Sequence, residues 1–66
     1  MKISFKALRV NAELTQKEAA EKLDITPATL QNWEAYITYP TAKQLMQMCS
    51  VYHCELSDIF LHESFA

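Results

Sequence analysis

Apolar residues recur along the chain at intervals of three and four positions, which is the spacing of one face of an α-helix. The residues expected to form the core on this basis are Leu8, Ala19, Ala20, Leu23, Leu30, Trp33, Leu45, Met48, Cys49, Tyr52, Leu56, Ile59 and Phe60. The chain contains no glycine, and tight β-hairpin turns depend strongly on glycine. The predicted fold class is therefore all-α.

Helix start signals divide the chain into five predicted helices. Ser4 is the expected cap of the first helix, and the sequences TQKE from Thr15 and TAKQ from Thr41 are capping boxes. Thr26 precedes Pro27, and proline is favoured at the first helical position. The last predicted helix is short and has the weakest cap. Counted from their caps, the predicted helices span residues 4–11, 15–23, 26–35, 41–52 and 55–61.

Length and composition indicate one small domain over residues 1–66. Half of the residues are hydrophobic and 21% are charged, which is a normal globular balance. No apolar run is long enough for a membrane span or a signal peptide, and two cysteines cannot form a dense disulfide framework. We therefore expect a cytoplasmic protein.

The formal net charge of −2 by itself disfavours nucleic-acid binding. The charges are unevenly placed, however, because the first 23 residues carry an excess of positive side chains and the rest of the chain an excess of negative ones. Evidence for nucleic-acid binding must therefore come from the arrangement of the predicted helices and not from the net charge.

The segment from Leu14 to Glu34 has the pattern of a helix-turn-helix unit, about residues 15–35. Small Ala20 permits a close crossing of its two helices, and Asp24 occupies the turn position that requires a left-handed backbone. Leu30 and Trp33 would face inward. Pro27, Ala28, Gln31 and Asn32 would then face outward on a helix able to enter the DNA major groove.

The chain resembles the Cro/C1-type helix-turn-helix family, the XRE-like phage and prophage repressors, over roughly residues 4–61. The matching positions are Leu8-Arg9, Leu14-Thr15-Gln16, Ala20, Leu23, Ile25, Thr26, Leu30, Trp33-Glu34, Pro40-Thr41, Leu45, Cys54 and Leu56. Three residues depart from the pattern, since Asp24, Tyr36 and His53 stand where the family typically has glycine. The resemblance implies a compact five-helix fold like that of lambda repressor.

The resemblance also implies roles for individual residues. The base-reading set is Pro27, Ala28, Thr29, Gln31 and Asn32, and the amides of Gln31 and Asn32 suit hydrogen bonds to adenine. The phosphate-contacting set is Gln16, Lys17, Thr26, Tyr36, Thr38, Tyr39 and Lys43. Arg9 and Glu34 match a structural ion pair.

Plainer interpretations exist for several of these residues. Without the resemblance, a solvated first turn is the preferred explanation of Gln16 and Lys17. Tyr36 and Tyr39 suit either phosphate contacts or a partner surface. Cys49, His53, Cys54 and His62 lack the spacing of a zinc site, so packing is the preferred explanation and no metal or other cofactor is expected.

The leading hypothesis is a sequence-specific, double-stranded DNA-binding transcriptional regulator, a repressor of prophage or mobile-element type. Such a protein is expected to act as a homodimer, with Phe60, Leu61 and Phe65 near the shared surface. The alternative is a protein-interaction module, such as an antirepressor or antitoxin, on the same fold. No enzymatic motif, membrane partner or small-molecule ligand is expected.

Overall fold

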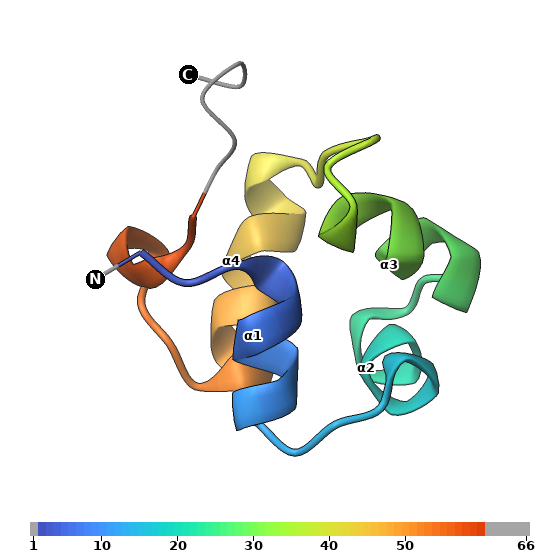
Figure 1. Ribbon diagram of the computed structural model, residues 1–66, viewed down its shortest axis with the longest axis horizontal. Coiled ribbons are helices and arrows are strands. Elements are labelled where there is room, and N and C mark those ends of the chain that lie inside the picture. The colour runs from blue at the N-terminus through green and yellow to red at the C-terminus, as the bar shows by residue number, and fades with distance from the viewer. Residues whose placement is uncertain (1, 61–66) are drawn as a thin grey trace.

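The computed structural model describes residues 2–60, which form four α-helices followed by one 3-10 turn. The helices are α1 (Phe5–Asn11), α2 (Gln16–Leu23), α3 (Pro27–Glu34) and α4 (Ala42–Tyr52), and the turn η1 spans Leu56–Asp58. A short turn joins α2 to α3, and both α1 and α4 pack against this pair (Figure 1). The predicted all-α fold class is confirmed, because no strand occurs between residues 2 and 60.

A hydroxyl side chain caps the start of each of these four helices. Ser4, Thr15, Thr26 and Thr41 each accept a hydrogen bond from the backbone N–H three positions further on. At Thr15 and Thr41 the capping box is complete, since Glu18 and Gln44 accept in return from the cap backbone at 2.9 and 2.7 Å. The four predicted helix starts are thus confirmed.

Each of the four helices also ends in the same way, although the chain has no glycine. The residues Glu13, Asp24, Tyr36 and His53 have φ angles of 59°, 57°, 58° and 55°. The amide after each one donates to the carbonyl five positions earlier, in the pairs Leu14–Arg9, Ile25–Ala20, Ile37–Asn32 and Cys54–Cys49. This is the Schellman motif, which satisfies helix carbonyls but costs a residue with a Cβ about 1–2 kcal/mol. The sequence indicated this backbone at Asp24 and missed it at Glu13.

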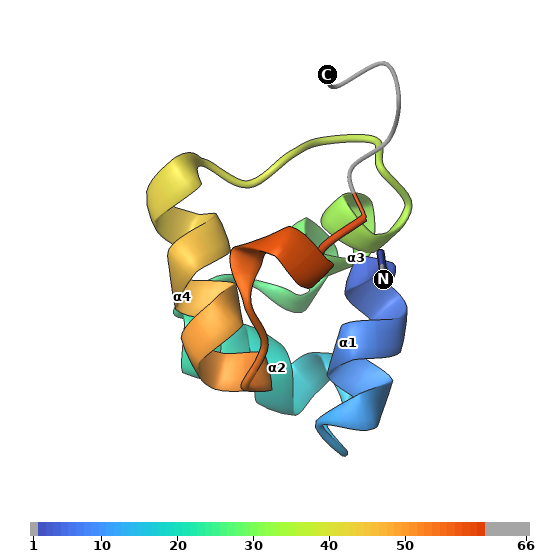
Figure 2. The same ribbon diagram turned by 90° about the vertical axis from the view of Figure 1, so that its left-hand side faces the viewer.

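The predicted fifth helix over residues 55–61 is wrong within the described residues. Only Leu56–Asp58 turn, as a 3-10 helix, and Ile59 is extended with φ −81° and ψ 126°. The extended backbone pairs with the other end of the chain in an isolated bridge between Ile3 and Ile59. Ile3 donates its amide to the Asp58 carbonyl at 2.6 Å, and the Phe60 amide donates to the Ile3 carbonyl at 2.7 Å. A continued helix would forfeit both bonds. Figure 2 shows η1 beside α4, with the chain start close to the segment that follows η1.

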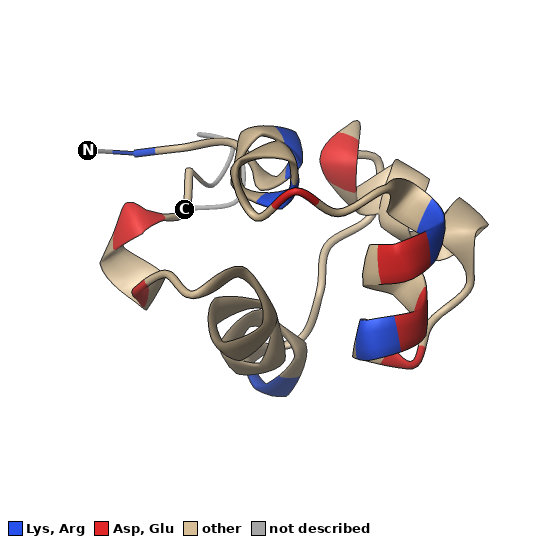
Figure 3. Cartoon of the chain, turned by 90° about the horizontal axis from the view of Figure 1, so that it is seen from below, with Lys and Arg blue, Asp and Glu red and all other residues tan. Residues whose placement is uncertain are grey.

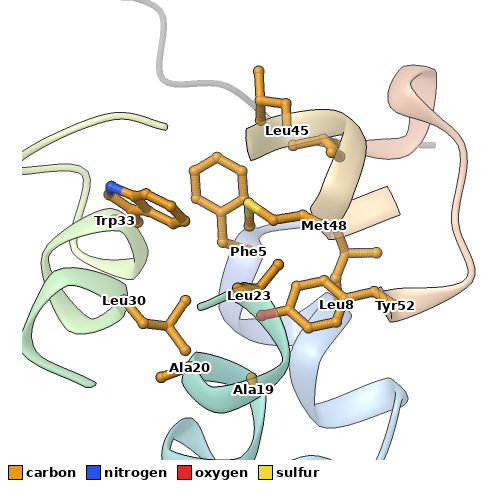
Figure 4. Close-up of a cluster of buried hydrophobic side chains, with 11 residues drawn as sticks. Phe5, Leu8, Ala19, Ala20, Leu23, Leu30, Trp33, Leu45, Met48 and Tyr52 are labelled. Carbon is orange, nitrogen blue, oxygen red and sulfur yellow. The ribbon is translucent and has the colours of Figure 1, made fainter. Parts of the chain in front are cut away.

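The core lies where the four helices converge (Figure 4). Its buried residues are Phe5, Leu8, Ala19, Ala20, Leu23, Leu30, Trp33, Leu45, Met48, Tyr52 and Ile59. Three predicted core residues differ: Leu56 and Phe60 are 55% and 39% exposed, and Cys49 is half-buried. The first two differ because the fifth helix, which would have turned them inward, does not form.

Candidate nucleic-acid interface

Helix α3 is fixed in its rotation by two buried side chains. Leu30 is fully buried and Trp33 is 3% exposed, and both point into the core (Figure 4). Because positions three apart lie on the same face of a helix, this packing directs the opposite face outward. Pro27, Ala28 and Gln31 are exposed there, and Asn32 is half-buried at its edge. The predicted base-reading residues thus lie together on one accessible face, with Thr29 half-buried beside them.

The start of α3 is held by two threonine hydroxyls. Thr26 Oγ1 accepts from the Thr29 amide at 3.2 Å and lies 2.9 Å from the Thr29 hydroxyl. Pro27 follows the cap, where its missing N–H costs no hydrogen bond. The Thr29 side chain is therefore engaged with the cap, and the exposed part of the helix start is the apolar pair Pro27 and Ala28.

A carboxylate at the end of α3 ties three helices together. Glu34 Oε2 accepts from Arg9 Nε of α1 at 2.6 Å, and Glu34 Oε1 accepts from Arg9 Nη2 at 3.2 Å. Glu34 Oε1 also accepts from Gln16 Nε2, at the first residue of α2, at 3.0 Å. The Arg9 and Glu34 side chains are 11% and 5% exposed, and the hydrogen bond to Glu34 is the main reason that the pKa of Arg9 is raised. The forked pair matches the geometry of a strong, buried ion pair.

The bond from Gln16 to Glu34 is a contact that sequence reasoning missed. It links the first residue of α2 to the last residue of α3. The two helices are therefore connected by this hydrogen bond as well as by the turn that joins them. An amide nitrogen carries two hydrogens, so Gln16 keeps a second N–H beyond the one donated to Glu34. The half-buried Gln16 side chain is therefore held in one orientation while retaining a donor for an external anion.

The remaining predicted phosphate contacts lie on three helices and one loop. Lys17 is exposed in the first turn of α2, Thr26 at the start of α3, Thr38 in the loop after α3, and Lys43 in the first turn of α4. Figure 1 shows α2, α3 and this loop following one another, with the start of α4 at the end of the loop. Tyr39, in the same loop, is half-buried.

Tyr36 differs from the other predicted phosphate contacts because its hydroxyl faces the protein. It donates to the Phe60 carbonyl at 2.9 Å and accepts from the Phe5 amide at 3.5 Å. Its ring stacks on Phe5 with centroids 5.2 Å apart, and the ring of Phe60 meets it edge-on at 5.9 Å. Burial raises the pKa of Tyr36 above its usual value. A phenol has one proton to donate, and in this structure that proton goes to Phe60.

Charge is distributed unevenly around these elements (Figure 3). On α2 the negative Glu18 and Glu21 lie between the positive Lys17 and Lys22, whereas the charged residues at and beside η1, Glu55 and Asp58, are both negative. Helix α3 carries a single charged residue, Glu34, and its carboxylate is neutralised by Arg9. The outward face of α3 is therefore uncharged, which suits contact with base edges better than contact with phosphates.

Other kinds of site find little support in residues 2–60. No three His, Cys, Asp or Glu side chains gather there in a way that could hold a metal ion. Cys49 and Cys54 lie next to each other, and burial raises the pKa of Cys54 to about 11, so this thiol is protonated near neutral pH. A hollow of about 440 Å³ beside the end of α4 is lined by Ala12, Leu14, Lys22, Ser50, Val51 and His53, and contains none of the predicted DNA-contacting residues. In this part of the chain, every helix is too short or too polar to cross a lipid bilayer.

The comparisons with known proteins agree with this geometry. The model of a helix-turn-helix family of the Cro/C1 (XRE) type matches residues 5–59, which include all the helices described above. Comparisons with curated proteins and with solved structures gave no significant match. The matched family is one of DNA-binding domains and not of enzymes. The chain therefore belongs to the Cro/C1-type helix-turn-helix family of DNA-binding regulators.

Proposed function

We propose that the chain is a sequence-specific transcriptional regulator that reads the DNA major groove with α3. The observation that carries this proposal is the outward face of α3, where Gln31 is exposed and Asn32 lies at the edge. Their amides can pair with adenine, and the exposed Pro27 and Ala28 suit contact with a thymine methyl group. Thr29 would contribute through its methyl group, because its hydroxyl is engaged with the cap.

Phosphate contacts from both sides of α3 would set its position in the groove. We assign them to Gln16 and Lys17 at the start of α2 and to Thr26 at the start of α3. Thr38, Tyr39 and Lys43 supply the contacts on the other side. Only two of these residues are cations, so we expect a shallow dependence of DNA affinity on salt, with each neutralised phosphate adding about 0.9 to the slope.

The regulator is further proposed to be a repressor of prophage or mobile-element type that acts in the cytoplasm as a homodimer. A dimer of helix-turn-helix domains reads two half-sites one DNA turn apart. Phe60, which is partly exposed near the end of the described chain, is one residue of the proposed shared surface. Leu61 and Phe65, the other two, lie outside the described residues.

The test is selection of bound sites from random double-stranded DNA, followed by fluorescence anisotropy with the selected site. Replacing Gln31 and Asn32 together by alanine should weaken binding by about 10-fold or more, because a good amide–adenine pair discriminates by about 1–3 kcal/mol. The matched control is Gln47→Ala, which removes an exposed amide from α4 and should leave binding unchanged. Circular dichroism would verify that both variants keep their helices.

Lys17→Ala should lower the salt slope by about 0.9, while Lys22→Ala at the other end of α2 should not. A selection that yields no preferred sequence at low salt would contradict the proposal. In that case the net charge of −2 favours the alternative, a protein-interaction module such as an antirepressor or antitoxin. Purification of that module from its native cells should then yield a stoichiometric protein partner.

A further inference from the structure

The loop after α3 and the end of the described chain are joined through one side chain, Tyr36. This residue follows the C-cap of α3 and holds a left-handed backbone with φ 58°. Its hydroxyl donates to the Phe60 carbonyl at 2.9 Å, although 24 positions separate the two residues. The same loop continues directly to Thr38 and Tyr39, which we assign to phosphate contacts.

The partner of Tyr36 is itself fixed by the other end of the chain. The Phe60 amide donates to the Ile3 carbonyl, and Ile3 donates to the Asp58 carbonyl. Tyr36 also stacks on Phe5 and lies edge-on to Phe60. We use the name latch for this set of contacts among Ile3, Phe5, Tyr36, Ile59 and Phe60. The latch thus connects the start of the chain, the end of η1 and the loop after α3.

The left-handed backbone of Tyr36 carries a conformational penalty. A left-handed backbone is unfavourable for a residue with a large side chain, and glycine would avoid the penalty. The contacts of the Tyr36 ring and hydroxyl can offset this penalty. These contacts require the left-handed backbone, since they depend on the direction in which the Cβ atom leaves the chain.

We propose that Tyr36 is a positioning residue, which orders the loop at 35–41 for DNA by anchoring it to the Ile3–Phe60 pairing, and is not itself a phosphate contact. The proposal rests on the proposed function, because it assigns the loop a place on DNA. Its consequence is that the segment at 59–60 and the DNA-facing loop move together. A change at Phe60 would then alter DNA affinity without touching the bases.

Three hydroxyl side chains provide a matched test, since each can lose its hydroxyl with little change of shape. The variants are Tyr36→Phe, Thr38→Val and Tyr52→Phe, where the Tyr52 hydroxyl is buried without a hydrogen-bond partner. Hydrogen exchange of the free protein is measured at the Ile3 and Phe60 amides, with the Leu23 amide of α2 as the internal reference. DNA affinity is measured by anisotropy with the selected site.

Tyr36→Phe should speed exchange at Ile3 and Phe60 by about three- to tenfold, the effect of one lost hydrogen bond, and leave Leu23 unchanged. It should also weaken DNA binding severalfold. Thr38→Val should weaken binding with no change in exchange, as expected for a direct contact from an exposed residue of the same loop. Tyr52→Phe should change neither local exchange at the latch nor DNA affinity.

Three results would overturn the proposal. Weaker DNA binding by Tyr36→Phe without faster exchange at Phe60 would make Tyr36 a direct phosphate contact. Faster exchange at all three amides would show only a general loss of stability. Faster local exchange with unchanged affinity would show that the latch does not act on the DNA-facing loop. If the unaltered chain selects no DNA site, the proposed function fails, and the proposed effect of the latch on DNA affinity fails with it. The exchange result still decides whether the latch forms.

Discussion

The α2–α3 unit and the latch are held in place in different ways. In the α2–α3 unit, the caps at Thr15 and Thr26 and the left-handed Asp24 each act over three to five positions. In the latch, the main contacts join residues far apart in the chain, such as Ile3 with Ile59 and Tyr36 with Phe60. The part that we assign to base reading is thus defined locally, whereas the loop beside it depends on the whole chain being folded.

This difference has a consequence for stability. Local signals make helices start and stop, but short helices gain most of their stability from tertiary packing. The α2–α3 unit is therefore expected to fail when its core contacts are removed. The latch is expected to open locally while the helices remain, because the two backbone hydrogen bonds that close it, Ile3 to Asp58 and Phe60 to Ile3, lie outside the four α-helices.

The largest effect is expected from Leu30→Ala, which removes a core contact of the α2–α3 unit. Leu30 is fully buried between the helices, and such a truncation costs about 2–5 kcal/mol. In a domain of this size that loss amounts to unfolding. Urea unfolding followed by circular dichroism measures it, and Met46→Ala, at a residue that is 67% exposed on α4, is the control. Equal stability of the two variants would show that the core does not hold α3.

A smaller loss is expected from Glu34→Gln, which keeps the shape of the side chain and removes its charge. Arg9 would then lie largely buried without a counter-ion, and Gln16 would lose a charged acceptor. We expect the free energy of unfolding to fall by about 1–3 kcal/mol. Glu21→Gln, at an exposed position of α2, removes the same charge and should change it by less than about 0.5 kcal/mol. If the two variants behave alike, the network does not contribute to joining the three helices.

The same division explains how much could be predicted from the sequence. The helix starts at Ser4, Thr15, Thr26 and Thr41 follow from residues within one turn, and the core residues of α2, α3 and α4 follow from helical spacing. The short helix expected over residues 55–61 does not form within the part of that range that the structure describes, because a backbone pairing with Ile3 replaces it. Nothing within residues 55–61 indicates that pairing.

The features of the candidate site also fall into two groups, those that follow from local sequence and those that depend on contacts between distant parts of the chain. The outward direction of Gln31 follows from the inward direction of Leu30 and Trp33, which is a local argument. The bond from Gln16 to Glu34 and the bond from Tyr36 to Phe60 depend on how distant helices pack. One signal for the second bond was present, since tyrosine stands at a position where the family typically has glycine. A residue that accepts an unfavourable backbone is a reason to look for a compensating contact.

A pH-dependent effect is expected from Tyr52, which lies in the core at the end of α4. Burial raises its pKa to about 12, compared with about 10 in an unfolded chain. Between these values the unfolded state releases the proton while the folded state retains it, so stability is present below pH 10 and declines as the pH rises toward 12. We expect a decline of about 1–2 kcal/mol from this group, measured by urea unfolding between pH 8.5 and 11.5. Tyr52→Phe should show a smaller decline and, having lost an unpaired buried hydroxyl, no lower stability at pH 8.5. Identical pH profiles would show that the Tyr52 hydroxyl is not buried as described.

The smallest effects are expected at two residues that share a backbone conformation, His53 at the end of α4 and Tyr36 in the latch. Both residues are left-handed in Schellman motifs, with φ 55° and 58°, but His53 is exposed whereas Tyr36 carries the latch. His53→Gly should raise the free energy of unfolding by about 0.5–1 kcal/mol, since relief of the Cβ penalty exceeds the entropy that glycine adds to the unfolded chain. Tyr36→Gly has the same backbone benefit but loses the stack on Phe5 and the bond to Phe60, so it should lower stability by about 1 kcal/mol. Changes of opposite sign in the free energy of unfolding, measured by urea unfolding, would separate the contribution of the latch from that of the backbone. If both variants gain stability equally, the ring and hydroxyl of Tyr36 add nothing, and the latch is only a consequence of how the helices pack.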